Sequence, residues 1–482
     1  MKARISRLSW LVVALLACGC EIHPVTPPPS SLTEYEESKA GSKHPYPDRT
    51  VVLHNLKRVL DPQLGQTERL ESLRLVSRIG EDDPEVQDQL AGLLADENCS
   101  EAMRAEVLAL VIEKDHPDAP GHVLKVLPTL RPEDPLKQRV LEWLARHPAP
   151  QVLAGLAKLW AREQSPTSLD EPRYRQVVER LTGQRWDQAL LDGIDTEGFG
   201  ARGSAIAILS ARRSRDEIAR AVAALPAKTD AVAAMQFFLD RFDYLPTSGP
   251  TLLSCVWLYA KDPSGFDGAA RLAADWRQSY GYRFDVRDFH LLSRLARDPL
   301  RKNYERTELV LRLVRGLIKR EHVRMAVTRP VGRYGFSDQF SKHVDSLTMA
   351  DLWNLLLLDE MMSRPRVRAA LAEVARRNQA DPGSARCGVV FYVEGQGEAK
   401  LYPPAYESDR IRAGRNALCR FGAHFEKPDN ADRAGPTAEE LQIAGRDNAY
   451  GLVLTSLAEE TFCAHYHNPK GIVISLGRFS FK

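Results

Sequence analysis

From about residue 50 to about residue 380 the chain repeats one pattern, a short amphipathic stretch closed by a helix-breaking residue. The stretches are about 10–16 residues long, which is typical of helices in globular proteins. TERLESLRLVSRIG places Leu70 and Leu73 near one face and ends in Gly80, which favours a helix C-terminus. SEAMRAEVLALVIEKD begins with Ser100, a good N-cap. Because no β-type alternation interrupts this span, the pattern excludes a mainly β fold for most of the chain.

Pairs of such helices over residues 50–240 resemble a HEAT-like α-solenoid, in which stacked pairs bury apolar faces that no single pair could bury alone. No fixed repeat length is present, and an irregular all-α domain is the alternative. Residues 241–380 form a further, less regular helical region, interrupted by SYGYRFDVRDF and RPVGRYGFSDQF. The concave surface of a solenoid suits an extended protein partner, so we expect a protein partner on the helical repeats.

Residues 381–482 have a different composition, rich in Val, Ile, Tyr and Phe between turn residues. Six segments predict strands: CGVVFYVEG, EAKLYPPA, ALCRFGAHF, YGLVLTSL, TFCAHYHN and GIVISLGRFSF. One helix, TAEELQIAGRDN, lies between the third and fourth segments. The sequence therefore predicts a multidomain chain, with an all-α helical-repeat body followed by a small α+β domain.

The N-terminus combines the cationic stretch MKARISR with a short apolar stretch, LSWLVVALLA, which is too short to span a bilayer. LLACGC follows, and small residues before a cysteine resemble the signal of a bacterial lipoprotein, with residues 1–20 as the signal peptide. The resemblance implies lipidation at Cys18, with Cys20 as the alternative; a plain signal peptide is the simpler explanation. No aspartate follows either cysteine, so we expect anchoring in the outer membrane of the cell envelope. Residues 21–49, rich in Pro and Ser, are predicted to be a flexible tether.

Charge and cysteine usage narrow the class of function. The net charge is +2, so bulk electrostatics give no reason to expect a nucleic-acid partner. None of the seven cysteines forms a C-x-x-C pair, which argues against a zinc knuckle. Cys387, Cys419 and Cys463 fall in the last hundred or so residues, and in an exported protein two of them could form a disulfide.

The stretch GAHFEKPDNADRAGPTAEELQIA, from Gly422 to Ala444, is the strongest candidate motif. Its order of strand, histidine, loop, Pro-Thr and acidic helix start resembles the JAB/MPN (JAMM) metal hydrolases, which bind zinc through H-x-H and S-x-x-D. The resemblance implies zinc ligation by His424 and Glu440, with zinc lowering the pKa of a bound water. Gly422 stands where the family has its first histidine, and Glu394 is a weak candidate for the catalytic base. The resemblance covers only the C-terminal domain.

Simpler explanations exist for these residues. His424 is equally typical of a half-buried strand histidine, and Thr437 with Glu440 matches a helix capping box. A second cluster, TFCAHYHNP, places His465 and His467 on one strand face, a spacing found among metal ligands. If the opposite face, with Phe462, Ala464 and Tyr466, forms the core, these histidines should point to solvent.

We therefore expect an exported, lipid-anchored scaffold or binding protein with a non-catalytic C-terminal module. Two alternatives remain at this point. One is a lipid-anchored zinc metallopeptidase of JAB/MPN type using His424, His465, His467 and Glu440. The other is a lipoprotein toxin or effector whose active module is residues 381–482.

Overall fold

The structure is a computed structural model that describes most of the chain. The described residues are 28–40, 48–80, 84–94, 96, 99–114, 119–130, 135–147, 150–162, 171–260, 266–298, 301–325, 338–381, 387–393, 396–402 and 418–482. They form a helical body followed by a small α+β domain, so the predicted fold class is confirmed. Two compact units are present, one with residues up to Leu156 plus Thr167–Gly183, the other with Ala157–Pro166 plus Gln184–Lys482. The predicted signal peptide, with Cys18 and Cys20, lies outside the described residues.

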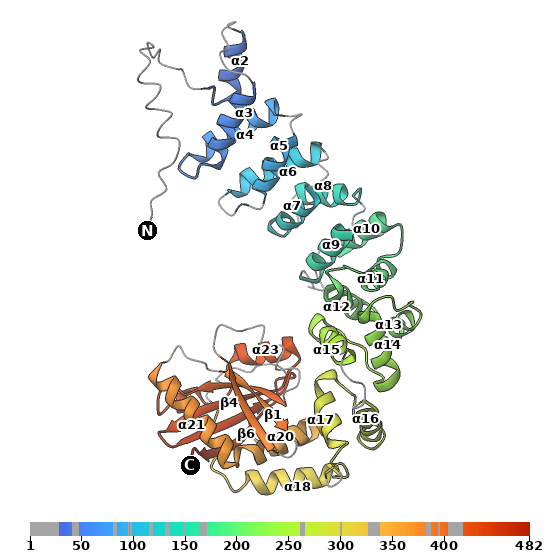
Figure 1. Cartoon of the computed structure of the whole chain (residues 1–482), viewed down its shortest axis with the longest axis vertical. Coiled ribbons are helices and arrows are strands. Elements are labelled where there is room, and N and C mark those ends of the chain that lie inside the picture. Colours follow the sequence, from blue (N-terminus) through green and yellow to red (C-terminus); the bar gives the residue numbers. More distant parts are fainter. Residues whose placement is uncertain are drawn as a thin grey trace. The chain divides into compact units, whose positions relative to one another are not determined.

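The first unit is helical throughout its described part (Figure 1). Consecutive helices pack on one another, as α3 does on α4 and α5 on α6. The predicted ends are confirmed: Gly80 follows the last residue of α4, and the Ser100 hydroxyl accepts a hydrogen bond from the Met103 amide at the start of α6. The helices here are α2 (Leu32–Ala40), α3 (Asp48–Leu60), α4 (Gln66–Ile79), α5 (Pro84–Leu93), α6 (Glu101–Lys114), α7 (Ala119–Val126), η1 (Leu127–Thr129), α8 (Pro135–Leu144) and α10 (Glu171–Thr182). Helix α9 (Pro150–Arg162) is divided, with residues up to Leu156 in the first unit and the rest in the second.

The structure differs from the predicted tether at α2. Tyr35 is only 6% exposed and packs against Val51 and Leu75. Its hydroxyl donates a 2.6 Å hydrogen bond to the Asp48 carboxylate. Leu32 of α2 joins the same apolar cluster, so the helix packs against α3 and α4 through contacts that composition does not reveal.

The helices of the second unit are α11 (Trp186–Ile194), α12 (Arg202–Arg212), α13 (Arg215–Ala223), α14 (Asp230–Phe242), α15 (Gly249–Tyr259), α16 (Phe266–Tyr280), η3 (Val286–Asp288), α17 (Phe289–Leu295), α18 (Arg306–Leu317), α19 (Phe340–His343), η5 (Val344–Ser346), α20 (Met349–Met362) and α21 (Pro365–Ala380). Here, too, consecutive helices pack on one another, as α11 does on α12 and α14 on α15. The axes of α12 and α15 come close because both have glycine at the contact. A Cβ on Gly203 would lie 2.7 Å from the Cα of Gly249. Helix α20 is buried on nearly every side, which explains why its sequence is apolar all round.

The α+β domain is a mixed sheet with the order β2-β1-β3-β4-β5-β6. Its elements are β1 (Cys387–Val393), β2 (Gln396–Tyr402), β3 (Cys419–His424), η6 (Ala431–Arg433), α23 (Ala438–Asp447), β4 (Gly451–Ala458), β5 (Thr461–His467) and β6 (Val473–Ser480). Strands β3 and β4 are parallel, joined through α23, and the other neighbours are antiparallel. All six predicted strands and the predicted helix are therefore present in the described residues.

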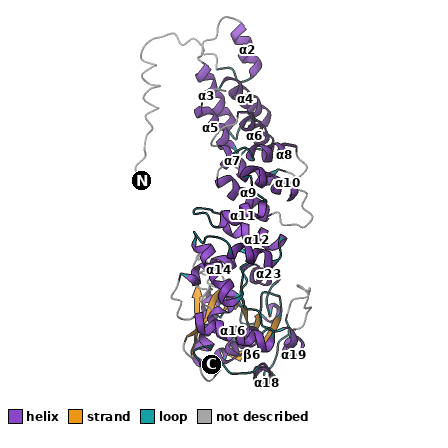
Figure 2. Cartoon of the chain, turned by 90° about the vertical axis from the view of Figure 1, so that its right-hand side faces the viewer, coloured by secondary structure: helices purple, strands orange, loops and turns teal. Residues whose placement is uncertain are grey.

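The two faces of this sheet are covered differently. The apolar face, which includes Phe421, Leu452 and Tyr466, belongs to one continuous hydrophobic core with helices α14 to α21. The opposite face, here called the α23 face, carries α23 (Figures 1 and 2). The change in composition near residue 381 therefore does not mark the start of a separate hydrophobic core. The helices before it bury one face of the sheet.

Among the described residues, no helix is both long enough and apolar enough to cross a membrane.

Candidate functional site

Strand register places the predicted site residues on the α23 face. Side chains alternate along a strand, so residues two apart share a face. His424 is in register with Thr455 of β4, which is in register with Cys463 of β5. Two residues earlier in β3, Gly422 is in register with Val453 of β4, which is in register with His465 of β5. Two residues earlier again, Arg420 is in register with Gly451, which is in register with His467. The three histidines thus share a face, with β4 between His424 and the other two.

His424 and Glu440 come together, as the motif implied. The His424 Nε2 lies 3.7 Å from the Glu440 Oε1. The other ring nitrogen, Nδ1, is 3.0 Å from the Arg433 carbonyl oxygen, and since a carbonyl only accepts, Nδ1 must carry the proton. When the imidazole is protonated, these residues form an ion pair at the partly exposed start of α23.

Glu440 is, however, already used by its own helix. Its Oε2 accepts hydrogen bonds from the backbone N–H of Thr437 at 2.8 Å and from the Thr437 hydroxyl at 3.0 Å. The Thr437 hydroxyl in turn accepts from the Glu440 amide at 3.2 Å. The capping-box explanation is confirmed, and it accounts for both residues without a metal.

A histidine at Gly422, where the metal-hydrolase motif places one, would require the Glu440 side chain to move. A Cβ on Gly422 would lie 2.6 Å from the Glu440 Oε1. A side chain at this position would have to displace the Glu440 carboxylate from the end of its capping box. The carboxylate therefore fills the space that the first histidine of the motif would need.

His465 and His467 are buried, so the expectation that they point to solvent is wrong. The sheet is covered on both faces, and His465 is 0% and His467 4% exposed. The His465 Nε2 is 3.4 Å from the Asp338 Oδ2. Burial alone would raise the pKa of Asp338, but the hydrogen bond and charge of His465 outweigh it and lower that pKa.

His467 lies directly over Gly451. Its Cε1 and Nε2 atoms are both 2.1 Å from where a Cβ on Gly451 would be, so only glycine leaves room for the ring. Burial lowers the pKa of His467 to about 4, and the imidazole is neutral near pH 7. Within the described part of the chain, its buried Nδ1 has no hydrogen-bond partner.

The predicted zinc ligands therefore do not fit a common site. Among the described residues, no three or more His, Cys, Asp or Glu side chains are grouped so that they could hold a metal ion. His424 and Glu440 are adjacent, whereas His465 pairs with Asp338 and His467 lies over Gly451. Glu394, the candidate base, lies outside the described residues.

Two of the three C-terminal cysteines are free buried thiols. Cys419 belongs to the apolar face and Cys463 to the α23 face, so their side chains leave the sheet on opposite sides. Burial raises the pKa of Cys463 to about 12, which makes its thiol unreactive near neutral pH. The side chain of Cys387 is not described.

A notch of about 250 Å³ opens between α23 and the sheet. Gly422 and Gly451 are part of its floor, Glu440 and Ile443 line it from α23, and His467 lines it from β5. The Arg420 guanidinium, which also lines it, is bound to Asp447 at 2.6 Å. The notch brings together a neutral imidazole and a capped carboxylate, but none of its described lining residues is a cysteine, serine or threonine that could act as a nucleophile.

Sequence reasoning missed a buried polar network that joins the helices to the sheet. Asp288 of η3 accepts hydrogen bonds from the hydroxyls of Tyr282, at 2.7 Å, and Tyr450, at 2.6 Å. Burial raises the pKa of both tyrosines well above their usual range, so they remain donors. Burial also raises the pKa of Asp288, to about 7, against the opposing influence of the neighbouring Arg287.

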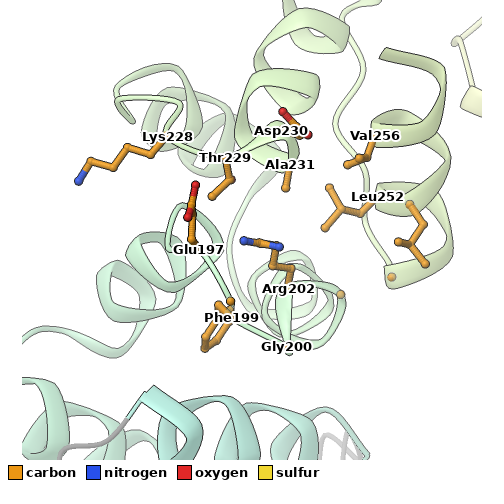
Figure 3. Close-up of a pocket in the computed structure, with 14 residues that line it drawn as sticks. Glu197, Phe199, Gly200, Arg202, Lys228, Thr229, Asp230, Ala231, Leu252 and Val256 are labelled. Atoms are coloured by element: carbon orange, nitrogen blue, oxygen red, sulfur yellow. The ribbon is translucent and has the colours of Figure 1, made fainter. Parts of the chain in front are cut away.

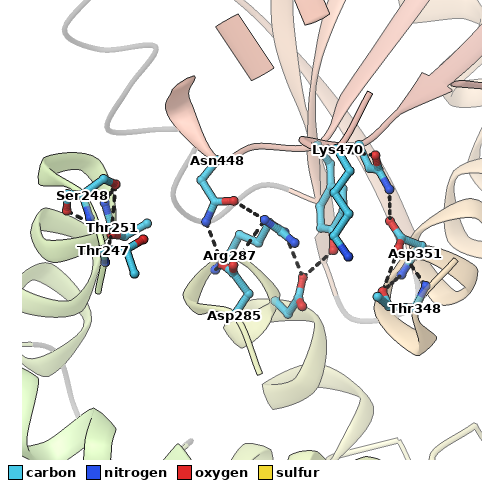
Figure 4. A network of polar contacts seen from close by, with 12 residues as sticks. Thr247, Ser248, Thr251, Asp285, Arg287, Thr348, Asp351, Asn448 and Lys470 are labelled. Carbon is cyan, nitrogen blue, oxygen red and sulfur yellow. Dashed lines mark hydrogen bonds and ion pairs between the residues drawn. The ribbon is translucent and has the colours of Figure 1, made fainter. Parts of the chain in front are cut away.

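The network continues on both sides of Asp288 (Figure 4). Arg287 donates to the Asn448 side chain, which donates a 2.8 Å hydrogen bond to Asp285. Further along the sheet, the Tyr466 hydroxyl donates to Asp351 at 2.7 Å. The carboxylate acceptors, Asp285, Asp288 and Asp351, come from the helical part, and most of the donors come from the α+β domain. The short interruption SYGYRFDVRDF carries Tyr282, Asp285, Arg287 and Asp288, and its dense charge and aromatic content was the available signal.

A larger cavity, of about 670 Å³, lies on the helical body (Figure 3). Its walls are the turn before α12, the turn before α14 and one side of α15. In Figure 3, Arg202 projects into the cavity, and Leu252 and Val256 face it from α15. Leu253, which also lines it, is 56% exposed. No motif in the sequence indicated this cavity, because two turns and one side of a helix, from separate segments of the chain, form it.

Together these features define a mostly helical protein with a small C-terminal α+β domain. Comparison with protein-family models, with curated proteins and with solved structures finds no match to this chain.

Proposed function

We propose that the protein is an exported, lipid-anchored scaffold that binds a protein partner through its helical body, with a non-catalytic C-terminal module. The observation that carries this proposal is the 670 Å³ cavity and the exposed Leu253 beside it. The walls combine apolar side chains, such as Leu252 and Val256, with charged ones, such as Arg202, and concave sites of this kind are typical of binding sites.

The walls of the cavity are held in place before any partner binds. The Arg202 guanidinium donates to the carbonyl oxygens of Ile194, at 3.0 Å, and Thr196, at 2.7 Å. The backbone N–H of Thr229 donates to the Asp195 carboxylate at 3.1 Å, which ties the second turn to the end of α11. A rigid site loses little conformational entropy on binding, and this favours recognition of a partner.

The C-terminal module suits a structural role better than an enzymatic or effector role. Glu440 is engaged in helix capping, and His465 and His467 are each buried in separate surroundings. The module also shares its core with the preceding helices, whereas an effector module is usually separable from its carrier. These observations support the scaffold over the JAB/MPN-type peptidase and over the toxin.

Site-specific photo-crosslinking tests the proposal. A photoreactive amino acid replaces Leu253 in the full-length protein, and the matched control carries it at Ala223, which is exposed on α13. We expect a discrete protein adduct from position 253 that is absent from position 223. Purified full-length protein with Leu253→Asp should then fail to bind the captured protein while unfolding at the wild-type urea concentration. Identical adducts from both positions, or wild-type affinity of Leu253→Asp, would contradict the proposal.

The anchor and the zinc alternative have separate tests. Incorporation of labelled palmitate should be lost in Cys18→Ala, or in Cys20→Ala if that cysteine is the lipidated one. Labelling that survives both substitutions would refute the proposed lipid anchor. Metal analysis of the full-length protein should give zinc well below one equivalent. One equivalent that disappears in His424→Ala would instead support the metallopeptidase.

A further inference from the structure

Helix α18 exposes an apolar stripe. Leu311, Val314 and Ile318 are exposed, and their spacing places them on one side of the helix. Ile318 is 78% exposed, more than any other large apolar side chain in the described residues. The opposite side, with Leu309 and Leu313, is buried in the core. A helix with two apolar sides has more apolar surface than this fold buries, and adjacent exposed apolar side chains indicate an interaction site.

A groove of about 520 Å³ runs beside this stripe. Val314 and Ile318 line it from α18, and Phe340 lines it from α19. The imidazole of His322, which also lines the groove, is held between two segments. Its Nδ1 is 2.9 Å from the Ser475 hydroxyl, and its Nε2 is 2.8 Å from the Leu317 carbonyl oxygen. The groove is therefore preformed and continuous with the stripe.

The charge next to the stripe is positive. Arg315, Lys319 and Arg324 are exposed, and none of them forms an ion pair with another described residue. The nearby carboxylates are neutralised: Glu308 pairs with Arg312 at 2.8 Å, and Glu321 with Arg478 at 2.9 Å. Asp338, in the groove itself, is mostly buried and lies against His465.

We propose that this surface, which we call the α18 surface (Leu311, Val314, Ile318, Arg315, Lys319 and Arg324), binds an acidic amphipathic helix of a partner protein. Apolar residues of such a helix would cover the stripe and enter the groove, and its carboxylates would meet the basic flank. A second copy of this chain is disfavoured, because two basic surfaces repel one another. A bilayer is disfavoured because a flat lipid surface leaves the groove empty.

This inference rests on the proposed partner-binding function and places a defined partner chemistry at a surface different from the Leu253 cavity. The probe is a fluorescein-labelled peptide of about 16 residues, with leucines at helical spacing and glutamates on the other side. The control peptide has the same composition in scrambled order. Fluorescence polarisation measures binding of both to the full-length protein. We expect the amphipathic peptide to bind at least about tenfold more tightly than the scrambled one.

Two exposed substitutions locate the site without disturbing the core. Ile318→Asp and Lys319→Glu should each weaken peptide binding by about tenfold, whereas Leu253→Asp should leave it unchanged. Binding should also weaken with added salt, and less so in Lys319→Glu.

Three outcomes would overturn the inference. The first is equal binding of the two peptides, and the second is wild-type affinity of Ile318→Asp for the amphipathic peptide. The third is that the protein binds vesicles containing anionic lipid but not the peptide, and that Ile318→Asp abolishes the vesicle binding. None of these depends on the Leu253 crosslink, so failure here leaves the Leu253 cavity to be judged by its own test.

Discussion

Replacing Tyr450 with phenylalanine tests whether the buried network fastens the α+β domain to the helices. The substitution removes one hydroxyl, which donates a 2.6 Å hydrogen bond to Asp288. The ring keeps its contacts, since it lies 5.9 Å from the Tyr466 ring and has the Arg287 guanidinium 5.1 Å from its centre. The effect should therefore be that of the lost hydrogen bond alone.

The expected magnitude follows from the burial of the acceptor. Asp288 is only 2% exposed, and water cannot replace the missing donor. At about pH 8.5 the Asp288 carboxylate is ionised, because this pH lies above its pKa of about 7. A hydrogen bond to a charged group contributes about 1.5–3 kcal/mol, so at this pH Tyr450→Phe should lower the free energy of unfolding by about 2 kcal/mol. Tyr282 would remain as a donor to the other carboxylate oxygen, at 2.7 Å, which limits the loss.

Urea unfolding followed by far-UV circular dichroism measures this change. The matched control is Tyr280→Phe, because Tyr280 is 37% exposed and its hydroxyl has no hydrogen bond in the described structure. The control should change stability by less than about 0.5 kcal/mol. In an Asp288→Asn background, Tyr450→Phe should cost about half as much, since the acceptor is then neutral. If Tyr450→Phe matched Tyr280→Phe, the network would not be fastening the domain.

Three further predictions follow from the described contacts. Gly203→Ala places a Cβ 2.7 Å from the Gly249 backbone, so the free energy of unfolding should fall by about 1–3 kcal/mol. The control, Gly92→Ala, has nothing within 4 Å of its Cβ and should raise the free energy of unfolding by about 0.5–1 kcal/mol. Urea unfolding midpoints compare the two variants, and equal effects would refute the close contact between α12 and α15. Burial lowers the pKa of His467 to about 4, so the unfolded chain binds its proton first and stability should fall by about 3 kcal/mol as pH drops from about 6.5 to about 4. His467→Phe should lose less stability over that range, and an unchanged pH profile would show that His467 does not titrate as argued. Thr437→Ala removes the capping box of α23 and should cost about 1 kcal/mol by the same urea measurement, with a negligible change counting against the capping role of Glu440.

The fold could be predicted because its signals are local. Amphipathic periodicity and caps such as Ser100 and Gly80 locate the helices, and runs of β-branched residues locate the strands. The capping box at Thr437 also needs only neighbours in sequence. Each of these signals lies within one turn or one strand of the residues it concerns.

The rest depends on contacts between distant segments. The shared core was not predictable, because the apolar face of the sheet gives no sign of which helices cover it. For the same reason, the alternation in β5 located His465 correctly on one face but did not reveal that this face is also buried. The Asp288–Tyr450 hydrogen bond spans more than a hundred residues, and no local pattern encodes such a pairing.

Comparison of two fragments tests most directly whether residues 381–482 are one side of a shared hydrophobic core and not a separable effector or enzyme. Residues 184–482, which correspond to most of the second unit, should give a cooperative urea transition and a dispersed amide NMR spectrum. Residues 381–482 alone, with the apolar face uncovered, should give neither. A dispersed spectrum and cooperative unfolding from residues 381–482 alone would contradict the account.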